Sequence, residues 1–377
     1  MQKIPFNAPS IVGDELAYIS DAIARGQLSG DGHYTKLCNK LIEAQTGSPK
    51  ALLTHSCTAA LEMAAILCDL APGDEVIMPS FTFVSTANAV ALRGAIPVFV
   101  DIDPDTLNIS PAAAEAAITD KTRAIFAVHY AGVPAEMDAL RELTDAHGLM
   151  LIEDAAQALG STYHGRPCGS LGDAAAFSFH ETKNLISGEG GALTINREDL
   201  AARAEIIREK GTNRSRFLRG QVDKYTWVDI GSSFLPGELV AAFLYGQLEN
   251  TAQVNNVRLA AFDSYNAAFA DLEQSERLRR PIIPQHAASN GHMFYLMLRD
   301  IADRDSFIAH MRDHGIATPF HYVPLHSSPG GETYGRVAGS LEVTDDTSAR
   351  LVRLPVYYSV GDKIDRVIEI ARTYLTA

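Results

Sequence analysis

The 377-residue chain is long enough for about two domains and for a sizeable buried core. Hydrophobic residues make up 46% and charged residues 21%, a balance that is typical of globular proteins and excludes the disordered and fibrous classes. The net charge of −14 argues against a protein that binds nucleic acid or a membrane surface, so an anionic ligand would need a local binding site.

The spacing of the cysteines and the N-terminal residues indicate in which cellular compartment the protein is expected. Four cysteines show no C-x-x-C spacing, which favours free thiols in a reducing compartment over a disulfide or zinc framework, and we predict no metal site. Residues 1–5 do not form the apolar core of a signal peptide, and no apolar run is long enough to span a bilayer. We therefore expect a cytoplasmic protein without a membrane anchor.

Two amphipathic helices are predicted first, over residues 14–26 and 34–46. From residue 51 onward, apolar strand patterns alternate with helical patterns. The predicted strands cover residues 51–53, 75–78, 97–100, 124–128, 149–152, 174–179 and 192–195, and the helices between them cover 57–70, 84–92 and 135–147. This alternation predicts a doubly wound α/β domain with a mainly parallel sheet, whose last two strands pair antiparallel because only a turn joins them.

The pattern changes in the C-terminal third of the chain. A helix over 199–210, a polar loop over 211–233 and a helix over 237–254 complete the first part. The rest predicts helices over 256–273, 304–314 and 361–375 and strands over 292–298 and 317–320. We therefore predict a large α/β domain of residues 1–250 and a small C-terminal α+β domain of residues 251–377.

Lys183 follows the predicted strand 174–179 and precedes the glycine cluster 188–191. A lysine near the end of a central strand is partly buried, which lowers its affinity for a proton and makes it a nucleophile toward carbonyl groups. Taken alone, such a lysine is more often a capping or salt-bridging residue. The glycine cluster does not match the G-x-G-x-x-G pattern of a dinucleotide-binding fold.

Two further strand ends carry candidate ligand-binding residues. Residues 54–60 pass from a strand into a helix whose first N–H groups are free to bind an anion, although an ordinary N-cap would look the same. Asp154 ends an apolar strand, so its carboxylate needs a cationic partner or strong hydrogen-bond donors, unless it only caps a helix. Together with Lys183 these features predict a site for pyridoxal phosphate (PLP) at the carboxyl edge of the sheet, with the phosphate at the helix, the ring nitrogen at Asp154 and the aldehyde at Lys183.

Five segments stand out in chain order: Pro79-Ser80-Phe81-Thr82-Phe83-Val84-Ser85-Thr86, Val128-His129-Tyr130-Ala131-Gly132, Glu153-Asp154-Ala155-Ala156-Gln157, Ser178-Phe179-His180 with Lys183, and Tyr322-Val323-Pro324-Leu325-His326. In this order they resemble the DegT/StrS family of sugar aminotransferases. The resemblance covers essentially the whole chain. It implies a PLP-dependent enzyme of the aspartate-aminotransferase-like (type I) α/β fold, with PLP bound in the large domain, and a homodimer with shared active sites.

The resemblance also implies roles for single residues. Lys183 would carry the cofactor and move the proton during transfer, and Asp154 would keep the ring nitrogen protonated. Gln157 matches a contact to the ring hydroxyl, and Phe83 matches an aromatic residue stacked on the ring. The implied phosphate contacts are Cys57, Thr58 and Ser178.

One segment departs from the family pattern. An asparagine that the family often donates to the phosphate of the neighbouring subunit is replaced here by the shorter Ser233, and Leu235 replaces an arginine. Ser233 is retained as a candidate cofactor contact. By resemblance, His326 would lie near the sugar. The candidate contacts to a substrate diphosphate lie in the loop 211–233, where they are Arg214, Arg219, Lys224 and Tyr225.

The resemblance implies the transfer of an amino group from L-glutamate to a nucleotide-linked keto sugar. Residues 208–215 and 220–227 are most similar to members that convert dTDP-4-keto-6-deoxyglucose to dTDP-4-amino-4,6-dideoxygalactose, for surface polysaccharide. The alternatives are a 3-aminotransferase acting on a dTDP-3-keto-6-deoxyhexose and a non-catalytic regulatory protein of the same fold. A sugar dehydratase is disfavoured, because a histidine replaces the lysine in those relatives.

Overall fold

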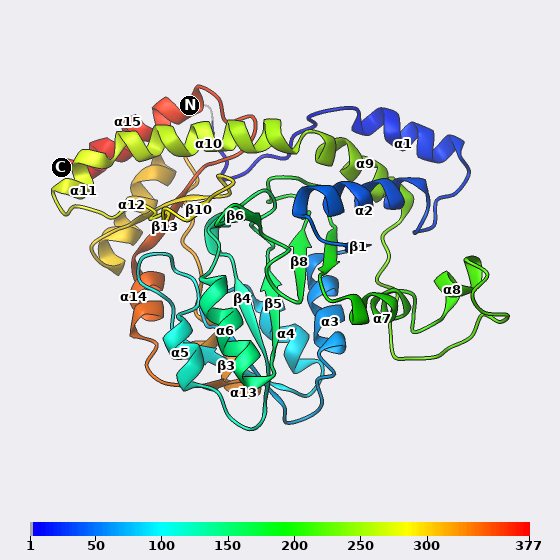
Figure 1. The fold of residues 1–377 in the computed structure, drawn as a ribbon. Coiled ribbons are helices and arrows are strands. Elements are labelled where there is room, and N and C mark those ends of the chain that lie inside the picture. The colour runs from blue at the N-terminus through cyan, green and yellow to red at the C-terminus, as the bar shows by residue number, and fades with distance from the viewer. Residues whose placement is uncertain (1–2) are drawn as a thin grey trace.

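An eight-stranded sheet forms the centre of the computed structural model, which describes residues 3–377 (Figure 1). Its strand order is β1-β9-β8-β5-β4-β2-β3-β12. The strands are β1 (Lys50–Thr54), β2 (Glu75–Pro79), β3 (Ile96–Val100), β4 (Thr122–Val128), β5 (Met150–Asp154), β8 (Ala174–Ser178), β9 (Gly191–Ile195) and β12 (Arg336–Val337). All neighbours pair in parallel except β9, which is antiparallel to both β8 and β1. The predicted α/β class, the mainly parallel sheet and the antiparallel last pair are confirmed.

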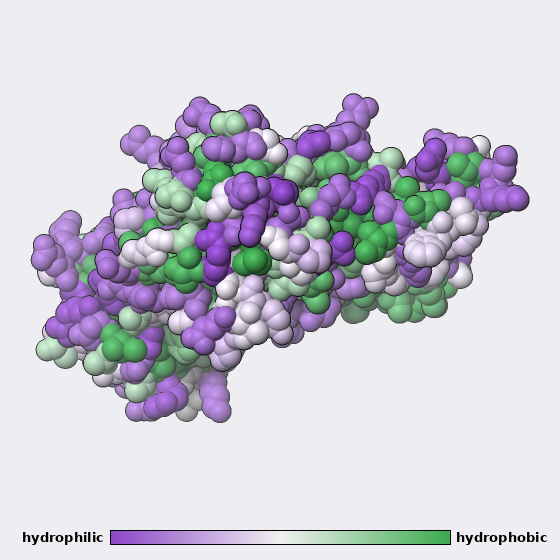
Figure 2. Space-filling model, turned by 90° about the horizontal axis from the view of Figure 1, so that it is seen from below, coloured by the Kyte–Doolittle hydropathy of each residue, from purple (hydrophilic) through white to green (hydrophobic). Residues whose placement is uncertain are grey.

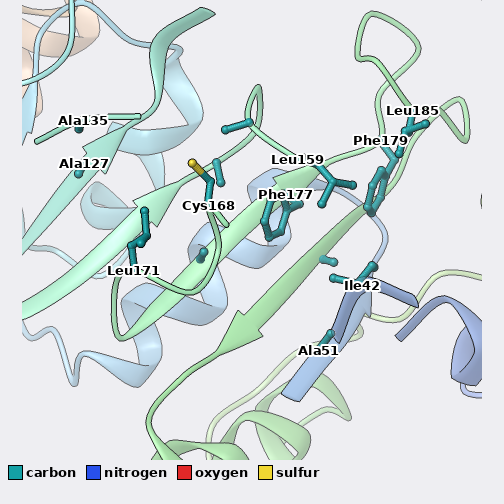
Figure 3. Close-up of a cluster of buried hydrophobic side chains, with 14 of the residues drawn as sticks. Ile42, Ala51, Ala127, Ala135, Leu159, Cys168, Leu171, Phe177, Phe179 and Leu185 are labelled. Carbon is teal, nitrogen blue, oxygen red and sulfur yellow. The ribbon is translucent and has the colours of Figure 1, made fainter. Parts of the chain in front are cut away.

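Helices cover both faces of this sheet because its strands are apolar on both sides. On one face, Leu53, Ile125 and Phe177 belong to a buried cluster with residues of α1 (Glu15–Ala24), α2 (His33–Thr46), α5 (Pro111–Ala116), α6 (Met137–His147) and α9 (Glu238–Glu249). Figure 3 shows part of this cluster around Phe177 and Phe179. On the other face, Leu52 and Phe126 pack with residues of α3 (Cys57–Leu67), α4 (Val84–Ala91) and α7 (Glu198–Arg208). The sheet is therefore the middle of three layers.

A second core lies in the C-terminal part of the chain. The two-stranded sheet of β11 (Phe294–Met297) and β13 (Leu351–Leu354) packs against α10 (Thr251–Ala268), α12 (Ile301–Asp313) and α15 (Lys363–Leu375). These elements lie together at the end of the molecule where α10 and α15 run side by side (Figure 1). Because this cluster is separate from those on the large sheet, we retain a division near residue 250 as a proposal. One short strand of the C-terminal part, β12, belongs to the large sheet, because it pairs with β3.

The remaining elements are short. They are α8 (Arg214–Leu218), α11 (Ala270–Gln274), α13 (Pro329–Tyr334), α14 (Glu342–Arg350), the 3₁₀ turns η1 (Tyr130–Gly132) and η2 (Leu325–Ser327), and the strands β6 (Thr162–Tyr163), β7 (Arg166–Pro167) and β10 (Ala287–Ala288). Among the residues described, no helix has both the length and the apolar character needed to cross a membrane.

One predicted strand is wrong. Residues 317–320 form no strand. Two isolated bridges lie at the ends of this segment, one between Ile4 and Ile316 and one between Phe320 and Val352. Pro319 has no N–H group to donate to a ladder, which prevents regular pairing there. The actual partner of β11 is β13, which the sequence analysis missed because it directly follows the helix α14.

The loop 211–233, which contains α8, stands out from the body at one side of the molecule (Figure 1). Its exposed apolar side chains include Leu218, at 63% exposure, and Trp227, at 78%. Figure 2 shows a face on which hydrophilic side chains predominate and hydrophobic ones lie in separate small groups. Exposed apolar side chains also occur singly elsewhere on the surface, but they are concentrated in this loop.

Candidate active site

A cavity of about 690 Å³ opens at the carboxyl ends of β5 and β8. Its lining comes from both parts of the chain: Asp154 and Ser178 end the two strands, Cys57 begins α3, and Met293 and Arg353 come from the C-terminal part. The carboxyl edge of an open α/β sheet is the usual place for a ligand. The structure brings together here the predicted residues Cys57, Thr58, Phe83, Asp154, Gln157, Ser178 and Lys183.

Lys183 lies in the turn that follows β8, with its backbone N–H donated to the carbonyl of His180 at 2.9 Å. The residue is half-buried and its side chain faces the cavity. Burial lowers the pKa of its ammonium below the usual value, although the nearby charges of Cys57 and Asp154 oppose this shift. Within residues 3–377 no carboxylate lies within ion-pair distance of it, so the interpretation of Lys183 as a salt-bridging residue is not supported.

Asp154 is the last residue of β5, and only 6% of it is exposed. Its Oδ2 accepts a hydrogen bond from Thr86 Oγ1 at 2.7 Å, and its Oδ1 accepts one from the N–H of Ala156 at 3.2 Å. No helix follows it directly, so Asp154 is not a helix cap. Its carboxylate has neutral donors, and among the described residues no cation lies within ion-pair distance of it, which leaves room for a cationic ligand atom.

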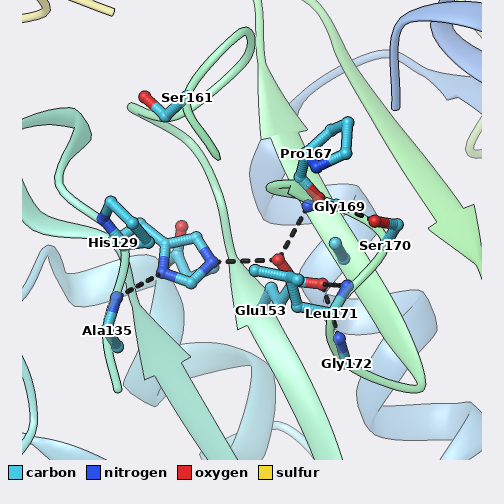
Figure 4. A network of polar contacts seen from close by, with 12 residues as sticks. His129, Ala135, Glu153, Ser161, Pro167, Gly169, Ser170, Leu171 and Gly172 are labelled. Carbon is cyan, nitrogen blue, oxygen red and sulfur yellow. Dashed lines mark hydrogen bonds and ion pairs between the residues drawn. The ribbon is translucent and has the colours of Figure 1, made fainter. Parts of the chain in front are cut away.

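The neighbouring residue Glu153 points to the opposite face of the sheet and anchors the strand end (Figure 4). Its carboxylate accepts a hydrogen bond from His129 Nε2 at 2.9 Å. Because His129 Nδ1 accepts from the N–H of Ala135 at 3.1 Å, Nε2 must carry the ring proton. Glu153 also accepts from the backbone N–H groups of Gly169, Leu171 and Gly172. The network ties the ends of β4 and β5 to the loop before β8, and so fixes the backbone that carries Asp154.

Cys168 lies beside this network, and its Sγ, His129 and Glu153 bring their ligand atoms within 4.8 Å of one another. Such a set resembles a metal site in composition. Each ring nitrogen of His129 and both oxygens of Glu153 are already engaged in hydrogen bonds, and burial raises the pKa of the Cys168 thiol well above its usual value. The cluster is therefore a structural support.

The N-terminus of α3 enters the cavity next to these side chains. Ser56 is the N-cap, and its hydroxyl accepts a hydrogen bond from the N–H of Ala59 at 3.0 Å. The first N–H groups of a helix have no partner within the helix, so those of Cys57 and Thr58 are available to an anion. The two interpretations of this segment, an ordinary cap and an anion site, are therefore compatible.

Gly191 lets the helix terminus lie this close to the sheet. It begins β9, where it pairs with Thr54 on one side and Ser178 on the other. A Cβ atom at this position would lie only 2.5 Å from the backbone nitrogen of Cys57. Glycine is thus required by the approach of the two backbones, which the sequence analysis did not recognise.

Gln157 and Phe83 both lie next to Tyr322. Both polar atoms of the Gln157 amide are hydrogen-bonded. Its Oε1 accepts from the N–H of Ala131 at 2.7 Å, and its Nε2 donates to the hydroxyl of Tyr322 at 3.1 Å. The ring of Phe83, which is 56% exposed, lies 6.5 Å from that of Tyr322. Tyr322 begins one of the family motifs, but the sequence alone indicates no role for it.

The candidate substrate contacts of the loop 211–233 do not line this cavity; they are Arg214, Arg219, Lys224 and Tyr225. Arg214 and Arg219 form ion pairs with glutamates of the same chain, Arg214 with Glu209 at 3.2 Å and Arg219 with Glu205 at 2.7 Å. Lys224 and Tyr225 are exposed. Within one chain, the projecting loop therefore does not contribute to the cavity.

His326 and Ser233 also lie outside the cavity lining. His326 Nδ1 lies 2.8 Å from Ser80 Oγ, and its Nε2 lies 3.3 Å from a carboxylate oxygen of Asp345. Ser233 is exposed and forms an isolated bridge with Glu209. Neither residue faces a ligand bound in the cavity of its own chain.

The residues of the cavity fit PLP. An exposed helix N-terminus suits a phosphate, a buried carboxylate without a cation suits a pyridinium N–H, and an unpaired lysine of lowered pKa suits an aldehyde. All three border one cavity large enough for a cofactor and a substrate.

Comparison with known proteins gives a consistent result. The model of the DegT/DnrJ/EryC1/StrS aminotransferase family matches residues 9–372. The spore coat polysaccharide biosynthesis protein SpsC of Bacillus subtilis (strain 168) is 34% identical over 381 residues, which are 98% of this chain and 96% of SpsC.

Two solved structures extend the comparison. The putative sugar aminotransferase Spr1654 from Streptococcus pneumoniae, in its PLP form, has a TM-score of 0.91 at 26% identity, covering 100% of this chain and 99% of its own. It was also solved in apo and PMP forms. DesV of S. venezuelae has a TM-score of 0.87 at 32% identity, covering 97% of this chain and 95% of its own. The likeness confirms the predicted aminotransferase fold.

Proposed function

We propose, since the chain belongs to the DegT/DnrJ/EryC1/StrS family of PLP-dependent aminotransferases, that it transfers the amino group of L-glutamate to dTDP-4-keto-6-deoxyglucose, giving dTDP-4-amino-4,6-dideoxygalactose. The observation that carries the proposal is the meeting of Lys183, Asp154 and the N-terminus of α3 at one cavity. The relative SpsC, by its name, acts in polysaccharide biosynthesis, which supports a product used in a surface polysaccharide.

Each of these groups has one task toward the cofactor. The N–H groups of Cys57 and Thr58, with the hydroxyl of Ser178, would hold the phosphate. The carboxylate of Asp154 would accept a hydrogen bond from the protonated ring nitrogen, and Thr86 keeps that carboxylate in place through its 2.7 Å hydrogen bond. PLP, when bound, supplies a ring that stabilises negative charge on the carbon atom next to the transferred nitrogen.

Lys183 is suited to move the proton that completes the transfer. Its lowered pKa means that Nζ loses its proton more readily than an exposed lysine does, and the free amine could then accept a proton from the substrate carbon. The same Nζ would return that proton to one face of the sugar carbon, and so would set its configuration. Gln157 and Tyr322, whose side chains are fixed by their mutual hydrogen bond, would help to hold the cofactor ring.

The loop 211–233 supports a homodimer with shared sites. It projects from the body, carries exposed apolar side chains, and does not reach the cavity of its own chain. We propose that it covers the cavity of a second copy, where Ser233 would approach the phosphate and the loop cations would meet the diphosphate of the substrate. His326, outside the cavity lining, would then act on the sugar only if the site narrows when substrate binds.

The position of amination is tested by offering purified enzyme the 3-keto and the 4-keto dTDP sugars separately, each with L-glutamate, and by identifying the product by NMR. We expect turnover of the 4-keto sugar and a 4-amino product with the galacto configuration. A clear preference for the 3-keto sugar would show that the enzyme is a 3-aminotransferase and would overturn the proposed substrate. Absence of amino transfer to either sugar would contradict the proposal as a whole.

A further inference from the structure

The turn that carries Lys183 is anchored through the side chain of the next residue. Asn184 Nδ2 donates to Oδ1 of Asn255 at 2.9 Å and to the carbonyl of Asn290 at 3.0 Å. Its Oδ1 lies 2.9 Å from Nδ1 of His292. All three partners belong to the C-terminal part of the chain, in α10 and in the segment between β10 and β11. Asn184 therefore joins the lysine turn to the C-terminal core.

These hydrogen bonds define which nitrogen of His292 carries the ring proton. The amide nitrogen of Asn184 donates to two oxygen atoms, so the amide oxygen Oδ1 is the acceptor. His292 Nδ1 must then be the donor. Burial lowers the pKa of His292 well below its usual value, so the ring is neutral near pH 7 and Nε2 carries no proton. His292 thus directs a single N–H group at Asn184.

The segment that carries His292 is itself firmly held. The backbone N–H of His292 donates to Oδ1 of Asn290 at 3.0 Å, and Asn290 Nδ2 donates to the carbonyl of Gln157 at 2.9 Å. Arg258 of α10 donates to the carbonyl of His292 at 2.6 Å. All four side chains are buried. The segment therefore keeps Gln157 and the turn of Lys183 in a fixed relation to each other.

We propose that His292 is a positioning residue for Lys183. This inference rests on the proposed function and assigns the group that holds its proton-moving amine in place. The N–H of His292 fixes Asn184, and Asn184 fixes the turn from which Lys183 extends into the cavity. A displacement of about 1 Å between reacting groups can lower a rate on the order of 100-fold, so a buried hydrogen bond one residue away from the lysine can control proton transfer.

A direct contact between His292 and the reacting groups is the competing interpretation, because this side chain also borders the cavity. The structure favours the indirect role. His292 Nδ1 is hydrogen-bonded to Asn184, whereas among residues 3–377 no partner lies within hydrogen-bond distance of Nε2. Substitution separates the two ring positions, since the amide nitrogen of asparagine takes the place of Nδ1 and that of glutamine takes the place of Nε2.

The first test uses the cofactor-free protein and measures amide hydrogen exchange by mass spectrometry. In His292→Leu the donor to Asn184 is lost, and the amides of residues 181–186 should exchange on the order of 10-fold faster than in wild type. In His292→Asn the donor is kept, so exchange should stay close to that of wild type. His147→Leu, at an exposed histidine of α6, is the matched control. Unchanged exchange in His292→Leu would show that His292 does not hold the turn.

The second test follows the glutamate half-reaction of PLP-loaded enzyme by stopped-flow absorbance. In His292→Leu the limiting rate should fall on the order of 10- to 100-fold, whereas the glutamate concentration at half-saturation should change only a few-fold. The isotope effect with 2-deuterated L-glutamate should increase, because proton transfer becomes the slowest step, and a general loss of structure would not produce this. His292→Asn should restore most of the rate.

Two further variants test whether His292 acts through Asn184. Asn184→Ala should lower the rate like His292→Leu, and the double variant should be no slower than the slower single variant, because the two residues act as one unit. Asn255→Ala removes an acceptor of Asn184 from outside the cavity lining, and it should give a smaller loss of the same kind. If His292→Leu does not fold, an unchanged rate in Asn255→Ala overturns the inference.

The outcomes separate this inference from the proposed function. If wild-type enzyme reacts with no amino acid, the proposed function fails, and hydrogen exchange still decides whether His292 holds the turn. If wild type reacts with glutamate and His292→Leu keeps both the rate and the isotope effect, His292 does not position Lys183 and the aminotransferase proposal still stands. A rate that His292→Gln restores and His292→Asn does not would assign a direct contact through Nε2 and overturn the inference, as would losses from His292→Leu and Asn184→Ala that multiply in the double variant.

Discussion

Lys183 faces the cavity without a carboxylate partner, and its lowered pKa gives a test on the cofactor-free protein. Between this lowered pKa and the ordinary value of 10.5, the unfolded chain binds a proton that the folded chain does not bind. The free energy of unfolding should therefore rise with pH across that window. In Lys183→Met this rise should be smaller, and the variant should be more stable than wild type at pH 7.

Urea unfolding at pH 7, 8 and 9 measures both effects. The exposed Lys40→Met is the control, and equal slopes in wild type and Lys183→Met would show that Lys183 is solvated like any surface lysine.

Asp154 is the second residue with a measurable role. In Asp154→Asn the side chain can still accept from Thr86, so the local fold should persist, but the negative charge that keeps the ring nitrogen protonated is lost. We expect the rate of amino transfer to fall by on the order of 100-fold or more while the cofactor still binds. Stopped-flow absorbance of the glutamate half-reaction, with the exposed Asp145→Asn as control, measures this. A rate within a few-fold of wild type would reduce Asp154 to a structural carboxylate.

Site residues could be predicted from the sequence where a chemically reactive side chain stands at the end of a predicted strand. Asp154 and Lys183 combine an unusual residue type with a position at the carboxyl edge of the sheet, and both line the cavity. His292 could not be found in this way, because it stands before a strand and far from Asn184 in sequence. Its hydrogen bond to Asn184 is a property of three-dimensional packing alone.

At the scale of elements, the contact between β9 and the start of α3 can be tested at Gly191. In Gly191→Ala the added Cβ would clash with the backbone at Cys57, which cannot move without shifting the helix terminus. We expect a loss of about 1–3 kcal/mol in the free energy of unfolding and weaker binding of the cofactor phosphate. Urea unfolding and PLP titration measure the two. Gly330→Ala is the matched control, since nothing lies within 4 Å of its added Cβ. Unchanged PLP affinity in Gly191→Ala would show that the helix terminus does not hold the phosphate.

Local periodicity predicted the elements of the large sheet well and those of the C-terminal part less well. The strands β4 and β8 are apolar on both faces and bounded by turns, which distinguishes them clearly from helices. The pairing of β11 with β13 joins residues more than fifty positions apart, and tertiary packing alone selects β13 over the segment 317–320. The crossing of β12 back to β3 has no local signal either.

At the scale of the whole molecule, the projecting loop 211–233 predicts that activity depends on assembly. If a second copy completes each site, the specific activity should fall on dilution below the dissociation constant of the dimer, in step with the dimer fraction seen by sedimentation. Charge reversal at Arg214 and Lys224 should raise the KM for the nucleotide sugar more than that for glutamate. A monomer that keeps full specific activity would contradict the shared site.

The central claim is that Lys183 holds the cofactor and releases it to an amino-acid donor. Borohydride reduction of the PLP-loaded protein, followed by peptide mass mapping, tests it directly, because reduction leaves a pyridoxyl group on the lysine that carried the cofactor. The account predicts the label on Lys183 and on none of the other eight lysines of the chain, and it predicts loss of the label when L-glutamate is added before reduction. A label on another lysine, or a label on Lys183 that glutamate leaves unchanged, would contradict it.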